Sequence, residues 1–302
     1  MNKVYSGWDS LPKGYCKDKI TEGCLVLEGG AFRGLYASGI LDVLMENDIN
    51  MSCVCGVSAG ALNGAKYAAG QIGRSARVNL RYRHDSNYVG VKPMFTQHGV
   101  IGFDYIFGEL EGVEPFDYDT FDKRRFVVVT TDVDTGRPRF WERSNCSDIW
   151  QAIRASASLP YVSSPVEVDG TYNLDGGCCI NLPYNWAIRQ GYKKIIVIKT
   201  RADDYREPPV SDMLLTITKT MYRDKPALCD NLCNRSERYN LELDELFYLT
   251  NHHRVFTFSP SRSLDDIGRL ETDIQKLGDL YYLGRKDCEE RLKDLKGYLN
   301  YV

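Results

Sequence analysis

The residues best suited to chemistry lie in the pentapeptide Gly56-Val57-Ser58-Ala59-Gly60, which fits the pattern G-x-S-x-G. A short apolar run precedes it and an alanine-rich run follows, so we expect a buried strand, a sharp turn at Ser58 and a helix. Small residues at Gly56 and Gly60 let the strand and helix backbones nearly touch. The turn places the serine hydroxyl at a helix N-terminus, where negative charge is favoured. This predicts a nucleophilic serine, although the pentapeptide alone also fits an ordinary strand–turn–helix.

A glycine-rich segment, Glu28-Gly29-Gly30-Ala31-Phe32-Arg33-Gly34, follows the preceding apolar run. Consecutive glycines let the backbone turn its N–H groups into a concave site that binds an oxygen atom. Beside a nucleophilic serine, such a site is an oxyanion hole for the tetrahedral intermediate of acyl transfer. The expected donors are the backbone amides of Gly29, Gly30, Ala31 and Ala59.

Arg33 and Gly34 are expected to support this loop. Arg33 has two open roles, because its guanidinium could bond the loop carbonyls or face an anionic head group. A dinucleotide-binding loop is the weaker alternative, since the spacing G-x-G-x-x-G is not met.

The two segments resemble those of the patatin-like phospholipase family of lipid acyl hydrolases. The resemblance extends to Asp175-Gly176-Gly177, which by itself indicates only a turn. This segment is the third of the three along the chain, and Asp175 lies 117 residues after Ser58. In that order it is similar to the segment that carries the family's catalytic aspartate. Asn181 and Pro183 match a downstream N-x-P of the family. The loop departs from the family's usual three glycines at Ala31, and alanine rarely adopts a left-handed backbone conformation.

The resemblance implies a Ser58–Asp175 dyad. A free serine hydroxyl is a weak nucleophile and needs a base within hydrogen-bond reach. In a dyad the carboxylate accepts the proton and then returns it to the leaving alcohol. A solvated aspartate, with a pKa of about 3.9, is a poor base at neutral pH. We therefore expect partial burial under the glycines to raise the pKa of Asp175. No histidine is required, and the four histidines lie outside all three segments.

The elements that position these groups follow from the apolar pattern. A strand over 24–27, a helix ending near 47 and a strand over 53–56 predict a βαβ crossover, with both loops at one carboxyl edge of a parallel sheet. A turn at Asp134-Thr135-Gly136 joins two antiparallel strands, and Asp169-Gly170 joins two more. The remaining strands are expected at 125–131, 137–142, 166–168, 171–174 and 193–199.

The resulting fold is a three-layer α/β/α domain with a mainly parallel central sheet and a helical C-terminal extension. We expect a surface arm over 1–22, a catalytic domain over 23–202, and an extension over 203–302 that packs on the core. Within the extension, 211–248 and 264–301 have helical patterns, and 253–259 fits a strand.

The segment 71–122 is harder to interpret. A helix is expected over 72–82 and a loop over 84–102. Several large apolar residues cluster there and either pack beneath the loop or form a lid or acyl-binding wall over the serine. They are Met94, Phe95, Ile101, Phe103, Tyr105, Ile106 and Phe107.

Composition excludes several classes of function. The chain has 302 residues and a net charge of −3, which argues against nucleic-acid binding through phosphate contacts. The ten cysteines form no C-x-x-C pair, and no acidic loop has calcium-ligand spacing, so we expect no metal and no cofactor. No secretory signal or membrane span is apparent, which favours a cytoplasmic protein. A transient contact with a membrane surface and the oligomeric state stay open.

Two other functions are compatible with the sequence. An α/β-hydrolase triad would combine Ser58 and Asp175 with His252 or His253. A non-catalytic binding protein could retain the fold, with Ala31 as its only support. For a hydrolase, the substrate could be a phospholipid, a neutral lipid or a small soluble ester. Transfer of the acyl group to an alcohol instead of water is equally open.

Overall fold

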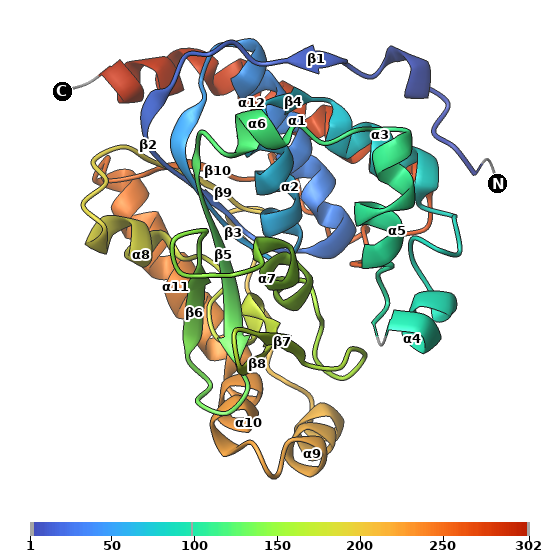
Figure 1. Ribbon diagram of the computed structural model, residues 1–302. Coiled ribbons are helices and arrows are strands. Elements are labelled where there is room, and N and C mark those ends of the chain that lie inside the picture. Colours follow the sequence, from blue (N-terminus) through green and yellow to red (C-terminus); the bar gives the residue numbers. More distant parts are fainter. Residues whose placement is uncertain (1–2, 98, 301–302) are drawn as a thin grey trace.

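A computed structural model describes residues 3–97 and 99–300 (Figure 1). Within these residues a sheet of eight strands runs through the centre of the molecule, in the order β10-β9-β2-β3-β5-β8-β7, with β6 paired to β5. Helices cover both faces. In Figure 1, α1 and α2 lie to the right of the sheet, and α8 and α11 lie to the left. The predicted three-layer α/β/α architecture is therefore confirmed.

The parallel part of the sheet consists of largely apolar strands. Such runs suit strands that are buried on both faces. These strands are β2 (Thr21–Leu27), β3 (Met51–Val57), β5 (Arg125–Asp132), β9 (Ile195–Ile198) and β10 (Phe256–Phe258). The predicted parallel pairing of the first two strands is confirmed, since Leu27 lies opposite Gly56. Antiparallel strands complete the sheet: β6 (Pro138–Trp141), β7 (Val166–Val168) and β8 (Thr171–Asp175).

One face of the sheet carries a core shared with helices on that side. They are α1 (Gly34–Glu46), α2 (Ala59–Ala68), α3 (Arg74–Tyr82), α7 (Ile149–Ser156) and α12 (Ile274–Asn300). The opposite face packs on α8 (Tyr184–Arg189) and α11 (Arg235–Asn251). No helix in the described ranges is both long enough and apolar enough to cross a bilayer.

Several boundaries differ from the prediction. The expected loop over 84–102 contains α4 (Val91–Gln97). Pro93 lies in the first turn of this helix, where proline is tolerated. The pattern over 211–248 is divided into α9 (Asp212–Met221), α10 (Pro226–Cys233) and α11. The helix expected over 264–301 begins only at Ile274, because the Asp273 carboxylate accepts the amide of Gln275 and caps it. Residues 264–273 are irregular.

The remaining elements are short. The terminal residues 1–2 and 301–302 of the predicted arm and extension lie outside the described residues. The arm pairs with the core through two-residue strands, and β2 already begins at Thr21. These elements are β1 (Gly14–Tyr15), β4 (Gln71–Ile72), α5 (Phe103–Phe107), α6 (Tyr118–Phe121) and the 3-10 turns Trp8–Ser10, Ala31–Arg33, Glu109–Gly112 and Gly176–Cys178.

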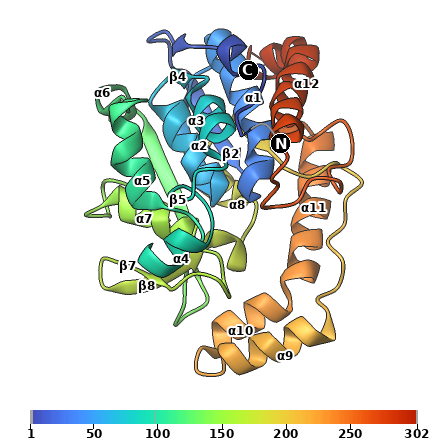
Figure 2. The same ribbon diagram turned by 90° about the vertical axis from the view of Figure 1, so that its right-hand side faces the viewer.

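Helix α12 packs on α1 with almost no space between the backbones (Figure 2). A Cβ on Gly284 would lie 2.0 Å from the carbonyl oxygen of Tyr36. Two hydrogen bonds also join the helices: the Tyr281 hydroxyl donates to Asp42 at 2.7 Å, and the Tyr36 hydroxyl donates to Asp287 at 3.0 Å. The C-terminal helix is therefore part of the main core.

This close contact predicts opposite effects for two glycine substitutions in α12. Gly284→Ala must push the helices apart, which we expect to reduce the free energy of unfolding by about 2–3 kcal/mol. Gly297 has open space around it, and Gly297→Ala should stabilise the helix by up to about 1 kcal/mol. Urea unfolding of both variants tests this. Equal midpoints would mean that α12 does not dock closely on α1.

Candidate active site

Ser58 lies between β3 and α2, with φ 57° and ψ −124°. A positive φ costs free energy for a residue with a side chain and persists only where the surroundings enforce it. Here a Cβ on Gly56 would lie 2.5 Å from the carbonyl oxygen of Gly60, and one on Gly60 would lie 2.4 Å from that of Leu27. The Ser58 amide donates to the Ser156 hydroxyl at 2.8 Å, which fixes the turn. The two glycines thus let the strand, turn and helix meet.

Asp175 lies at the end of β8, on the far side of β5 from Ser58. In the sheet, Val57 pairs with Val129 and Thr130 pairs with Asp175, so the serine and the aspartate flank β5 at the same level. The carboxylate accepts the amide of Gly177 at 2.8 Å. The topology therefore brings together two residues that are far apart in sequence.

The surroundings of Asp175 change its acidity. The side chain is only 5% exposed, and burial raises the pKa of the carboxyl to about 6. The Ser58 hydroxyl, the Gly177 amide and Arg269 each lower the pKa and oppose the effect of burial. A carboxylate with this pKa is ionised at neutral pH yet is a stronger base than a solvated aspartate.

The glycine-rich loop lies directly against the serine. A Cβ on Gly29 would lie 2.9 Å from Ser58 Cβ, and the Thr200 hydroxyl donates to the Gly29 carbonyl at 2.6 Å. Gly30 has φ 145°, and Ala31 has φ 51°. Within the described ranges, no hydrogen-bond acceptor is paired with the amides of Gly29, Gly30 or Ala31. Alanine thus adopts the left-handed conformation, and three amides stay available beside the hydroxyl.

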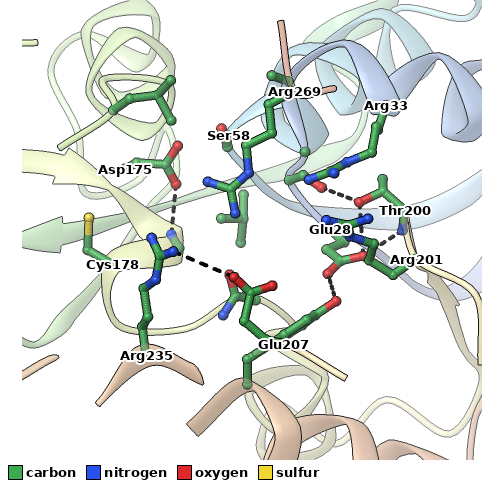
Figure 3. Close-up of a pocket in the computed structure, with 18 of the residues that line it drawn as sticks. Glu28, Arg33, Ser58, Asp175, Cys178, Thr200, Arg201, Glu207, Arg235 and Arg269 are labelled. Carbon is green, nitrogen blue, oxygen red and sulfur yellow. Dashed lines mark hydrogen bonds and ion pairs between the residues drawn. The ribbon is translucent and has the colours of Figure 1, made fainter. Parts of the chain in front are cut away.

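Four arginines line the pocket on one side of the serine (Figure 3). Arg235 pairs with Glu207 at 3.6 Å, and Arg201 pairs with Asp265 at 3.3 Å. Arg33 and Arg269 have no ion-pair partner among the residues the structure describes. In Figure 3, Arg269 extends into the pocket between Asp175 and Arg33. This arginine-lined pocket therefore favours an anionic group.

Arg33 does not make the loop-bracing bonds that the sequence left open. It is 5% exposed, its Nε has no hydrogen-bond partner, and no bond joins its guanidinium to a loop carbonyl among the described residues. Burial, with Arg201 and Arg269 nearby, lowers its pKa to about 10. Gly34 is held instead by Asn63, whose amide donates to the Gly34 carbonyl at 2.9 Å.

A second pocket, mostly apolar, meets the first at Ser58. Ala31, Ser58 and Leu159 line both pockets. The segment 84–102 contributes Tyr88, Val89 and Ile101 to this wall. The predicted cluster is otherwise divided: Phe103, Tyr105, Ile106 and Phe107 pack in or against the core, whereas Met94 and Phe95 are exposed. Apolar side chains from several elements complete the pocket, including Phe32, Leu35, Leu62 and Leu270.

The two histidines of the alternative triad lie away from these pockets. His252 and His253 are exposed and precede β10. Because β10 runs parallel to β9, β2 and β3, residues before β10 lie at the sheet edge opposite Ser58. Neither pocket has a histidine in its described lining. Among the described residues no group of histidine, cysteine or acidic side chains is arranged to hold a metal ion.

The part of the site contributed by the residues that follow β9 could not be recognised from the sequence. Glu28 anchors the loop there, because its carboxylate accepts the Thr200 amide at 2.5 Å and the Tyr239 hydroxyl. No short sequence motif marks the residues after β9 that line the pocket. They are Thr200, Arg201, Glu207, Leu232, Arg235, Tyr239 and Arg269.

The glycine-rich loop, the serine turn and the Asp175 segment all lie within a region that matches a known family. Residues 25–188, more than half of the chain, match the family model of patatin-like phospholipases. The chain belongs to this family. Residues 225–300 match a second model, described as a domain of unknown function, DUF6363.

Relatives of this patatin-like chain include the uncharacterized protein YjjU of Escherichia coli, 30% identical over 58% of this chain and 51% of YjjU. Lysophospholipase nte1 of Aspergillus fumigatus is 26% identical over 90% of this chain but only 18% of that protein. The chain thus spans about half of the first and less than a fifth of the second. Among solved structures, VipD from Legionella pneumophila aligns with a TM-score of 0.46 and 11% identity, over 91% of this chain and 67% of VipD.

The left-handed backbone at Ala31 predicts that glycine there stabilises the fold. This conformation costs an L-residue about 1–2 kcal/mol, part of which glycine loses again as chain entropy. We expect Ala31→Gly to raise the free energy of unfolding by roughly 1 kcal/mol. Ala68→Gly, at the end of the helical α2, should lower it. Urea unfolding measures both, and a destabilised Ala31→Gly would show that the residue is not strained.

Proposed function

We propose that this chain hydrolyses carboxylic esters of lipids, with Ser58 as nucleophile and Asp175 as general base and acid. The observation that carries the proposal is that a serine on a strained turn and a buried carboxylate flank β5 at the same level and line one pocket, beside three unpaired amides. Ser58 attacks the ester carbonyl carbon and transfers its proton to Asp175. The oxyanion accepts hydrogen bonds from the amides of Gly29, Gly30 and Ala31, with Ala59 as a further donor.

Collapse of this intermediate breaks the ester bond. Asp175 returns its proton to the departing alkoxide, and the acyl group stays on Ser58. Water then loses a proton to Asp175 and attacks the acyl carbonyl, and the same amides hold the second oxyanion. The serine recovers its proton as the carboxylic acid leaves. Each step uses one base, which matches a pocket whose described lining contains no histidine.

The two pockets suggest how an ester binds. The apolar pocket suits the acyl group, and the arginine-lined pocket suits a leaving group that carries negative charge, such as a phosphate-bearing glycerol. Arg33 and Arg269 are the cations with spare capacity for that charge. The lysophospholipase names of some relatives fit this substrate class.

A transient contact with a membrane surface is part of the proposal. Helix α9 exposes Met213, Ile217 and Met221, which are spaced four residues apart and so share one face. An exposed apolar face of this kind suits contact with the lipid surface that holds the substrate.

Removal of either reacting group should abolish turnover. We expect Ser58→Ala and Asp175→Asn each to reduce kcat at least about a thousandfold on p-nitrophenyl esters, while retaining cooperative unfolding. Asp204→Asn, at an exposed aspartate outside the described lining of both pockets, is the matched control and should retain full activity. Full activity of Asp175→Asn would exclude the aspartate as the base.

The raised pKa of Asp175 predicts the pH dependence. The carboxylate must be ionised to accept the serine proton, so kcat/KM should be constant above neutral pH and fall below about pH 6. The expected slope is about tenfold per pH unit. Chromatography of the released acid measures the rate, and circular dichroism at each pH separates protonation from unfolding. If kcat/KM instead fell only near the pKa of a free aspartate, the role of burial would be contradicted.

A further inference from the structure

The apolar pocket beside Ser58 contains a buried lysine. Lys66 lies on α2, eight residues after Ser58, and it lines this pocket together with Leu62 and Asn63. Its side chain is only 8% exposed. A lysine at the edge of an apolar region normally extends its amine to water. Here the amine stays inside, among residues that would contact an acyl group.

The Lys66 amine has little to bind. Its one hydrogen bond among the described residues goes to the Ser75 hydroxyl, at a long 3.5 Å. That hydroxyl already donates to Asn63 at 2.5 Å and accepts from Ser38 at 3.2 Å. No carboxylate in the described part of the chain pairs with Lys66, and burial together with Arg74 lowers its pKa to about 7. A buried amine without an anion costs free energy.

The other polar groups at this end of the pocket are already paired. Asn63 donates to the Gly34 carbonyl at 2.9 Å. Asn79 accepts the Tyr88 hydroxyl at 2.7 Å and donates to the Ser75 carbonyl at 2.8 Å. Lys66 is therefore the group with spare donors, and the neighbours hold it in place. A purely structural role would be served better by methionine, which fills similar space without burying a charge.

We propose that Lys66 binds the far end of the acyl group, and that the preferred acyl group ends in a carboxylate. This rests on the proposed reaction, in which the near end of the acyl group is the ester carbonyl at Ser58. The apolar walls would cover the methylenes between the two ends, and the amine would form a charge-assisted hydrogen bond with the terminal carboxylate. A methyl-ended chain leaves the amine unpaired, so the pocket discriminates against it.

The position of Lys66 limits the length of this acyl group. Eight residues of helix span about 12 Å at 1.5 Å per residue. The lysine side chain leans toward the helix N-terminus, which brings the amine closer to Ser58 than that. The acyl group is therefore short to medium, in the range of adipic to suberic acid, and the leaving group stays on the arginine-lined side.

Matched esters test this assignment. Mono-p-nitrophenyl adipate and p-nitrophenyl hexanoate have acyl chains of equal carbon number and differ at the far end. We expect the wild type to favour the adipate ester in kcat/KM, and Lys66→Met to reduce that ratio about tenfold or more. Lys293→Met, an exposed lysine on α12, should leave both values unchanged. Thermal unfolding checks that each variant is folded.

Binding of free acids separates this inference from the proposed reaction. Calorimetric titration with suberate and octanoate needs no turnover. Suberate binding that Lys66→Met weakens, in a protein that hydrolyses neither ester, would support the lysine site and overturn the hydrolase. Hydrolysis with no preference for the carboxylate-ended ester, or an unchanged ratio in Lys66→Met, would overturn the lysine site alone. Failure of both ester preference and suberate binding would also overturn it.

Discussion

The structure of the site depends on one close backbone approach, between the loop after β2 and the turn after β3. Gly60 lies against the carbonyl oxygens of Leu27 and Glu28, and Gly29 lies against the side chain of Ser58. Any side chain at these glycines would separate the amides of the loop from the serine hydroxyl. The parallel pairing of β2 and β3 sets the spacing, and the glycines allow the two connections to use it.

The residues that follow β9 hold this approach from outside. Thr200 and Tyr239 bond the Glu28 carboxylate, and the Phe32 amide donates to the Arg269 carbonyl at 3.1 Å. The same segment that fixes the loop directs the Arg269 side chain into the pocket and places Leu270 in the apolar one. A division of the chain after residue 202 therefore separates residues that line one site. The extension therefore contributes to the lining of both pockets as well as to the packing of the core.

Most of the fold could be predicted because apolar runs and turn residues are local signals. The runs at 24–27 and 125–131 became central strands, and Asp169-Gly170 became a hairpin turn. The helix predicted over 264–273 was wrong. Leu264 and Ile267 are buried at a helix-like spacing, although the backbone there is irregular. Arg269 and the burial of Lys66 could not be predicted, because both depend on which distant elements meet around Ser58.

Several features that cost free energy of folding lie around Ser58. Ser58 and Ala31 have left-handed backbones, Asp175 is a buried carboxylate, and Lys66 is a buried amine without an anion. Each costs free energy, and each lies within or beside the two pockets that meet at the serine. The well-packed sheet and the α1–α12 contact offset that cost elsewhere. Local costs that gather where reacting groups converge are typical of a site selected for binding and chemistry over stability. The same reasoning groups Lys66 with Ser58, as one of the residues that we propose bind the substrate.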